Sequence, residues 1–148
     1  MIDWVRRLFV NRQEKPLQGV PAIRRVKTYS ALSGYVYQYV YAGYRDREGE
    51  APARSYVFQV SGQRIAALAL SIELPASVVV NLEQYAGRTI DAREQYALAK
   101  MMLFRFLDDW SGAPSQGAGD DTANTNPSTL SCVLHDQAAR EIWETLDL

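Results

Sequence analysis

Residues 35–44 read Tyr-Val-Tyr-Gln-Tyr-Val-Tyr-Ala-Gly-Tyr, and this stretch decides the fold class. Tyrosine and valine favour strands, and their alternation has the period of two that a strand requires. Successive side chains of a strand point to opposite faces, so one face must carry Tyr35, Tyr37, Tyr39 and Tyr41. The other face carries Val36, Gln38, Val40 and Ala42. The stretch therefore predicts a strand with one aromatic face.

Two further strands are expected directly after this one. The polar stretch from Arg45 to Arg54 ends the first strand, and residues 55–60 (Ser-Tyr-Val-Phe-Gln-Val) have the composition of a second. Ser61-Gly62 is a turn signal, and a third strand over 65–74 places four large aliphatic side chains on one side, namely Leu68, Leu70, Ile72 and Leu74. Both connections are too short for a helical crossover, so we predict an antiparallel meander over about 35–74.

A first helix is predicted immediately after the meander, over 76–86. Pro75 suits the first turn of a helix, and Gly87 is a natural stop. The helical period places three apolar side chains on one stripe, namely Val78, Leu82 and Tyr85.

A second and longer helix is predicted over 92–110. Asp91 can cap it, and Glu94 then occupies the position that a capping box needs. One stripe holds Tyr96, Ala99, Leu103, Phe106 and Trp110, with Ala97, Met101 and Phe104 beside it. A helix that is apolar on several sides is nearly surrounded by other elements, so we expect this one at the centre of the core.

The two ends of the chain are expected to form smaller elements. Residues 2–10 predict a short amphipathic helix, and residues 111–128 predict a flexible loop because they carry no apolar side chain larger than Ala or Pro. After this loop, Leu130, Cys132 and Leu134 alternate as in a short strand. Asp136 can cap a final helix that buries Ala139, Ile142, Trp143 and Leu146.

Together these elements predict an α+β fold in a single domain, residues 1–148. A small antiparallel sheet of three to four strands packs on the helices at 76–86 and 92–110. The C-terminal strand and helix, residues 129–148, return after the loop to close the core or to cover the sheet. The length of 148 residues, with 47% hydrophobic and 22% charged residues, suits one globular domain and excludes global disorder, collagen and coiled coil.

The formal net charge of −1 hides an asymmetry along the chain. Residues 1–28 carry seven basic and two acidic side chains, whereas residues 108–148 carry one basic and eight acidic ones. Such an asymmetry is found where one end is an interaction tail, and also where the two ends lie together and neutralise each other. The total excludes a uniformly basic nucleic-acid binder, but it permits a local basic patch.

The single cysteine and the absence of targeting signals indicate a soluble, cytoplasmic protein. Cys132 excludes an intramolecular disulfide and a cysteine-based zinc cluster, which fits a reducing compartment. The first residues contain Trp4, Arg6 and Arg7 within their apolar stretch, unlike a signal peptide. No apolar run approaches the length of a transmembrane segment.

Few side chains are suited to catalysis. Cys132 and His135, the only histidine, stand three residues apart and point to opposite faces of a strand, which makes them a poor nucleophile–base pair. No glycine-rich loop lies between a strand and a helix, and no set of ligands has the spacing of a metal site. We expect no cofactor and no metal, and we favour a non-enzymatic protein. A small enzyme with a carboxylate or tyrosine site remains an alternative.

The tyrosine row is the feature that points to a function, and it allows two arrangements. In the first, Val36, Val40 and Ala42 face the helices, and the tyrosines form an open aromatic platform. In the second, the N-terminal segment or the C-terminal strand and helix cover the tyrosines, whose rings then belong to the edge of the core. Only the first arrangement leaves the rings free to recognise a partner.

The leading hypothesis is a protein-interaction or adaptor module that binds another protein, or itself, through the open platform, because tyrosine is a common interface anchor. The alternative is a binder of single-stranded nucleic acid or nucleotides, whose bases stack on aromatic rings beside basic side chains. The candidate partner-binding residues are Tyr35, Tyr37, Tyr39, Tyr41, Arg24, Arg25, Lys27 and Arg45. Contact of residues 2–10 with a membrane surface is the less favoured alternative to docking of that segment on the domain.

Overall fold

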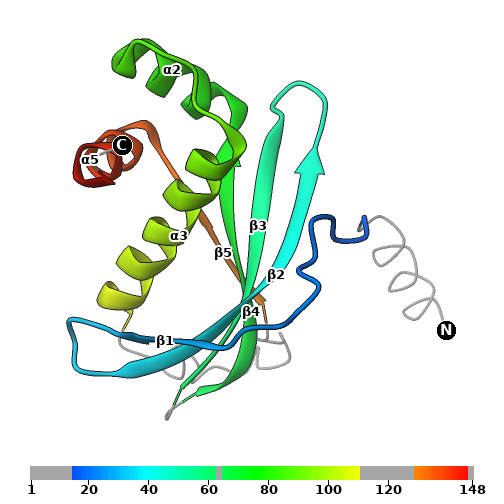
Figure 1. Ribbon diagram of the computed structural model, residues 1–148, viewed down its shortest axis with the longest axis vertical. Coiled ribbons are helices and arrows are strands. Elements are labelled where there is room, and N and C mark those ends of the chain that lie inside the picture. Colours follow the sequence, from blue (N-terminus) through cyan, green and yellow to red (C-terminus); the bar gives the residue numbers. More distant parts are fainter. Residues whose placement is uncertain (1–14, 63–64, 111–128, 147–148) are drawn as a thin grey trace, which may run out of the picture.

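The computed structural model describes residues 15–62, 65–110 and 129–146, which form a layer of helices on one side of a single sheet (Figure 1). In chain order the elements are β1 (Lys27–Ser30), β2 (Val36–Arg47), β3 (Ala53–Gly62), β4 (Ile65–Pro75), α2 (Ala76–Ala86), α3 (Ala92–Asp109), β5 (Thr129–Val133) and α5 (Asp136–Leu146). The α+β class is confirmed. The helix predicted at 2–10 and the loop predicted at 111–128 lie outside the described residues.

The sheet has five strands in the order β1-β2-β3-β4-β5, whereas three to four were expected. The antiparallel meander of β2, β3 and β4 is confirmed. Strand β5 pairs with β4 in parallel, so the sheet is mixed. The strand that the sequence did not predict is β1, which pairs antiparallel with β2. Its four residues, Lys-Thr-Tyr-Ser, are mostly exposed and lack the apolar alternation that identifies a strand.

The strand register places the tyrosines on the same face as the large apolar side chains of the meander. Tyr39 lies opposite Val60, and Tyr41 lies opposite Phe58. Val60 and Phe58 in turn lie opposite Leu68 and Leu70 of β4. Phe58, Val60 and Leu70 are completely buried, and each contributes about 1.5–3 kcal/mol to folding through the apolar surface it removes from water. The aromatic face is therefore the core face of the sheet.

Helix α3 covers this aromatic face. The Tyr29 ring stacks on Phe104 with 4.1 Å between centroids, and the Tyr37 ring lies parallel to that of Trp110 at 6.0 Å. Near the start of the helix, Tyr41 meets Tyr96 edge to face at 4.9 Å. Leu98, Ala99, Leu103 and Leu107 of α3 are buried, as expected for a central helix. The ring contacts run along the length of α3, so the helix is fastened to β1 and β2.

The predicted helix boundaries at 76–86 and 92–110 are confirmed within one residue. Asp91 caps α3 through a capping box: its side chain accepts a hydrogen bond from the Glu94 amide, and the Glu94 side chain accepts one from the Asp91 amide. Gly87 follows α2 with a φ of 79°, in the left-handed region that suits glycine. Tyr85, predicted on the apolar stripe of α2, is instead exposed, and its hydroxyl donates to Glu144 of α5.

The start of α5 differs from the expectation. The Ala139 amide donates to the His135 carbonyl, so His135 holds the cap position and Asp136 is the first residue of the helix. The Asp136 carboxylate instead accepts hydrogen bonds from the Asn81 amide of α2 at 3.2 and 3.3 Å. Ala139 and Ile142 are buried, and Trp143 and Leu146 pack against the core. Helix α5 lies beside α2 and α3.

The segment that precedes β1 runs along the outer edge of β2 (Figure 1). Gln18 exchanges two backbone hydrogen bonds with Tyr44, at 2.8 and 2.9 Å. The register of β2 against β3 shifts between Tyr41 and Gly43, which is a β-bulge. Gly43 is buried against the backbone of the passing segment, so the bulge is the point at which that segment is attached.

Candidate functional site

The tyrosine row is covered, so the open platform is not the arrangement that the structure adopts. The exposed fractions of Tyr37 and Tyr39 are 2% and 5%, and Tyr35 and Tyr41 are half-buried. The cover over Tyr37 and Tyr39 is α3, which was not proposed for that role in the second arrangement, and Pro21 and Ile23 of the N-terminal segment lie beside Tyr39 and Tyr41. A base cannot stack on the face of Tyr37 while Trp110 occupies it.

Two tyrosine hydroxyls tie the β1–β2 hairpin to the end of α3. Tyr29 donates to the Asp108 carboxylate at 2.8 Å, and Tyr37 donates to the Trp110 carbonyl at 3.2 Å. The same Asp108 oxygen accepts the Leu32 amide at 2.9 Å. Burial, with the hydrogen bond to Asp108, raises the pKa of Tyr29 to about 12. These contacts fasten the fold, and they give Tyr29 and Asp108 structural roles.

The four basic candidates are divided between different surroundings. Arg24 donates to the Gln59 side chain at 3.1 Å, on the face of the sheet opposite the helices. Arg45 donates to the Lys15 carbonyl at 2.6 Å and holds the N-terminal segment. Only Arg25 and Lys27 accompany tyrosines of the row, in a hollow at the edge of β2.

This edge hollow has a volume of about 180 Å³ and is lined by Pro21, Ile23, Arg25, Lys27, Tyr39, Tyr41 and Tyr96. Lys27 lies directly opposite Tyr39 in the β1–β2 register, so both side chains are on the helix-facing side. Lys100 of α3 places its Nζ 5.9 Å from the Tyr39 ring centroid. Burial and the nearby Lys27 ammonium lower the pKa of Lys100. Tyr96 and Lys100 were not among the predicted site residues, because only the docking of α3 brings them to β1.

The phenols of the edge hollow are neutral hydrogen-bond donors. Tyr39, Tyr41 and Tyr96 donate to no residue in the described part of the chain, in contrast to Tyr29 and Tyr37. Burial raises the pKa of each of these three phenols, which keeps the proton on the oxygen at neutral pH. The hollow therefore combines cationic groups with neutral donors, and no carboxylate of the described residues lines it.

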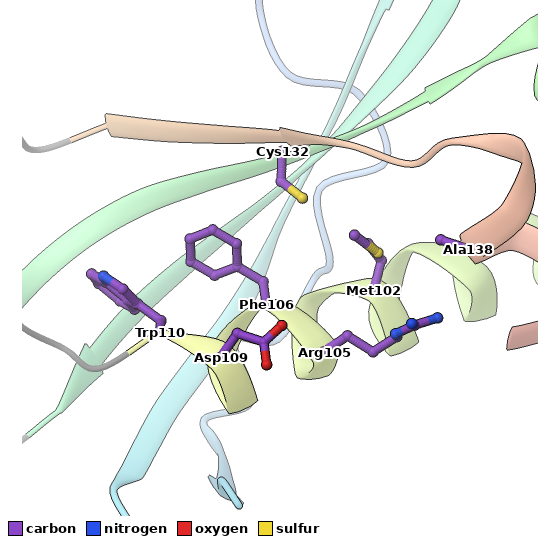
Figure 2. A pocket seen from close by; sticks show the side chains of 7 residues that line it. All are labelled: Met102, Arg105, Phe106, Asp109, Trp110, Cys132 and Ala138. Carbon is purple, nitrogen blue, oxygen red and sulfur yellow. The ribbon is translucent and has the colours of Figure 1, made fainter. Parts of the chain in front are cut away.

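A second pocket lies between α3 and β5, and Figure 2 shows the Cys132 side chain pointing from β5 toward α3 within it. Its volume is about 420 Å³, and Met102, Phe106 and Trp110 form its apolar wall. Burial raises the pKa of the Cys132 thiol, which makes it a weaker nucleophile at neutral pH. His135 is exposed, and its backbone carbonyl accepts the Ala139 amide at the start of α5. At the rim, Arg105 pairs with Glu141 at 2.9 Å.

A third pocket, of about 370 Å³, lies at the other end of β2 beside an ion pair. Arg54 binds Asp46 through two hydrogen bonds, at 2.7 and 3.0 Å, and its guanidinium lies 3.8 Å from the Tyr44 ring centroid. The hydrogen bond from Arg54 lowers the pKa of Asp46. These charges neutralise each other across β2 and β3, so the pocket presents no unpaired charge from Arg54 or Asp46.

The chain before β2 forms a surface that the sequence reading missed. Five of the seven exposed large apolar side chains among the described residues lie between positions 20 and 36, namely Val20, Ile23, Val26, Leu32 and Val36. Residues 15–44 contain four basic side chains and no acidic one. The described basic residues of this segment form no ion pair with the acidic residues near the C-terminus. We call residues 20–32 the basic edge.

No helix in the described ranges is long and apolar enough to span a bilayer. Among the same residues, no group of three or more His, Cys, Asp or Glu side chains is placed to hold a metal ion. No protein-family model, curated protein or solved structure matches this chain.

Proposed function

We propose that this protein is a non-enzymatic binding module that pairs with an extended, acidic segment of a partner protein along the basic edge. The observation that carries the proposal is the exposure of Ile23, Val26 and Leu32 at 64%, 62% and 86% on a part of the chain that has no acidic residue. Exposed apolar side chains gathered at one edge are typical of an interaction surface.

The backbone of β1 supports strand addition. Strand β1 is the last in the sheet, with no neighbour on its outer side among the described strands. The Ala31 amide donates to the Tyr35 carbonyl, and the alternation of an antiparallel ladder then directs the backbone groups of Thr28 and Ser30 outward. Unpaired strand edges bind extended peptides through main-chain hydrogen bonds, while side chains provide the specificity.

The charge of the edge selects the partner. Arg25 and Lys27 would repel the same residues of a second copy paired edge to edge, which disfavours self-association through β1. An acidic strand brings carboxylates to these cations and apolar side chains to Ile23 and Val26. The proposal keeps the protein-binding module expected from the sequence but moves its surface from the tyrosine faces to the strand edge.

The test uses a synthetic strand of alternating valine and glutamate, its valine–lysine counterpart and an oligothymidylate as probes. We expect the acidic peptide to shift the amide resonances of β1 saturably, and the basic peptide to leave them unchanged. Binding of the oligothymidylate in place of the acidic peptide would overturn the proposal, and so would a dimer formed by the free protein at the concentrations used.

Variants test whether the peptide binds to the basic edge or to another part of the surface. Thr28→Pro removes an amide that points outward from the sheet. It should weaken binding of the acidic peptide at least about tenfold, because a main-chain hydrogen bond to the peptide and the bonds next to it are lost. Ile23→Ser should weaken it about threefold to tenfold through lost apolar contact. Val80→Ser, at a side chain 50% exposed on α2, is the matched control and should leave the affinity unchanged. An equal loss in Ile23→Ser and Val80→Ser would contradict a site on the basic edge.

A further inference from the structure

Three cationic side chains from two segments of the chain lie on the helix-facing side of the basic edge. Lys27 of β1 and Arg25 line the edge hollow. Lys100 of α3 lies next to the hollow, where its Nζ is 5.9 Å from the Tyr39 ring centroid and its charge interacts with that of Lys27. None of the four ion pairs among the described residues includes any of the three. Folding therefore gathers like charges at this point without a described carboxylate to balance them.

This arrangement opposes folding unless an anion is present. Lys27 and Lys100 repel each other, and Lys100 is partly withdrawn from water by the rings of Tyr39 and Phe104. Either effect alone makes the charged ammonium less favourable. An anion between the cations would turn this repulsion into attraction, as at sites where oxyanions are bound by Arg and Lys.

We infer that the edge hollow binds the phosphoryl group of a small molecule, with Arg25, Lys27 and Lys100 as cationic partners and Tyr39, Tyr41 and Tyr96 as neutral donors. A phosphoryl group carries more charge and more acceptor oxygens than a carboxylate, which suits three cations and three phenols. The volume of about 180 Å³ equals that of about six water molecules, enough for one such group. The inference does not depend on the partner protein proposed above, although Arg25 and Lys27 border both sites.

The test titrates the protein with inorganic phosphate and with glycerol phosphate, using chloride and acetate at matched ionic strength as controls. We expect saturable shifts of the Tyr39, Tyr41 and Tyr96 ring resonances with both phosphate probes and with neither control. Tighter binding of glycerol phosphate identifies an esterified ligand, whereas equal binding identifies free phosphate. Shifts that follow ionic strength alone would overturn the inference, because they report only screening of surface charge.

A matched pair of variants tests the geometry. Arg25→Gln and Arg24→Gln remove the same charge from adjacent positions, but Arg24 bonds Gln59 on the opposite face of the sheet. We expect Arg25→Gln to lower the affinity for phosphate about tenfold, the loss that follows removal of a charged hydrogen bond. Arg24→Gln should change that affinity by less than about twofold. Equal losses of affinity in the two variants would show that phosphate responds to the general positive charge of the surface, and they would overturn the proposed site.

Lys100→Gln distinguishes this phosphate site from the peptide-binding site on the basic edge. This variant should lower the affinity for phosphate about tenfold and leave the affinity for the acidic peptide unchanged, because Lys100 belongs to α3 and not to the strand edge. Thr28→Pro should do the reverse. Unfolding in urea verifies that each variant is folded, and Lys100→Gln should unfold at a urea concentration no lower than the unsubstituted protein in chloride. Unchanged phosphate binding by folded Lys100→Gln would contradict the inference.

Discussion

Gly43 shows at the scale of one residue how the fold depends on backbone freedom. Its φ is 132°, and an added Cβ would lie 2.7 Å from the Gln18 backbone oxygen. Both the conformation and the close approach therefore require glycine at this bulge. The bulge lets the segment before β1 approach β2 and form the edge hollow.

We predict that Gly43→Ala lowers the free energy of unfolding by about 2–4 kcal/mol, since positive φ alone costs about 1–3 kcal/mol and the contact with Gln18 adds to it. Gly49→Ala is the control, because Gly49 has a φ of 108° with no heavy atom within 4 Å of an added Cβ. Urea unfolding followed by circular dichroism measures both. A loss no greater in Gly43→Ala than in Gly49→Ala would mean that the contact with Gln18 has no energetic weight.

The individual tyrosines of β2 were assigned correctly to one face, because a period of two follows from strand geometry alone. Which face meets the helices was left open by the sequence reading. Two predicted features bear on this choice, namely the aliphatic side of 65–74 and the turn signal at Ser61-Gly62. They relate Val60 to Leu68, but the β2–β3 register, which places Tyr39 on the same face, is known only from the structure.

Helix α3 begins at the residue that the sequence predicts, because its start is specified locally. Asp91 and Glu94 satisfy each other's backbone amides within one turn, and Arg88 pairs with Glu94 at 2.8 Å. The hydrogen bond from Arg88 lowers the pKa of Glu94, followed by that from the Asp91 amide. No distant part of the chain is needed for this start.

We predict that Asp91→Ala lowers the free energy of unfolding by about 1 kcal/mol, the usual effect of losing an N-cap side chain. Thr89→Ala is the control, because only the backbone carbonyl of Thr89 accepts a hydrogen bond among the described contacts. The midpoints of urea unfolding compare the two at neutral pH. A Thr89→Ala variant that loses as much stability as Asp91→Ala would refute the role of the capping box.

Local sequence could not define strand β1 or the strand with which β5 pairs. Strand β1 forms because the open edge of β2 offers unpaired amides and carbonyls, which Lys27–Ser30 can satisfy despite weak strand composition. Strand β5 was expected, but its parallel pairing with β4 was not. A long connection leaves the direction of return undetermined, since it can reach either edge of the sheet in either orientation.

At the scale of the whole molecule, the packed tyrosines make the fold sensitive to alkaline pH. Burial raises the pKa of six phenols above the ordinary value of 10, namely Tyr29, Tyr37, Tyr39, Tyr41, Tyr56 and Tyr96. The folded state thus binds more protons than the unfolded state above pH 10. Their contribution to stability is complete below that pH and is lost as the pH rises toward the raised values.

We predict that the free energy of unfolding falls steeply between about pH 10 and about pH 12. The lowered pKa of Lys100 has the opposite effect, because it makes stability rise with pH just below the ordinary pKa of a lysine. This is one group, however, whereas six tyrosines destabilise the fold as the pH rises. Urea unfolding at stepwise pH measures the fall, and tyrosinate absorbance should rise together with loss of structure. Tyr39→Phe, which removes one such phenol, should reduce the slope. Constant stability up to about pH 11 would contradict burial of these phenols.

The sequence by itself determined the α+β class, the three meander strands, the extents of α2 and α3 and the shared face of the tyrosines. Each follows from short-range physics: side-chain period, turn residues and caps act within a few positions. Tertiary structure alone decided that α3 covers the tyrosines, that β1 pairs with β2, and that Lys100 approaches Lys27 and Tyr39. These outcomes depend on which surfaces bury the most apolar area together, and that competition involves residues far apart in the chain.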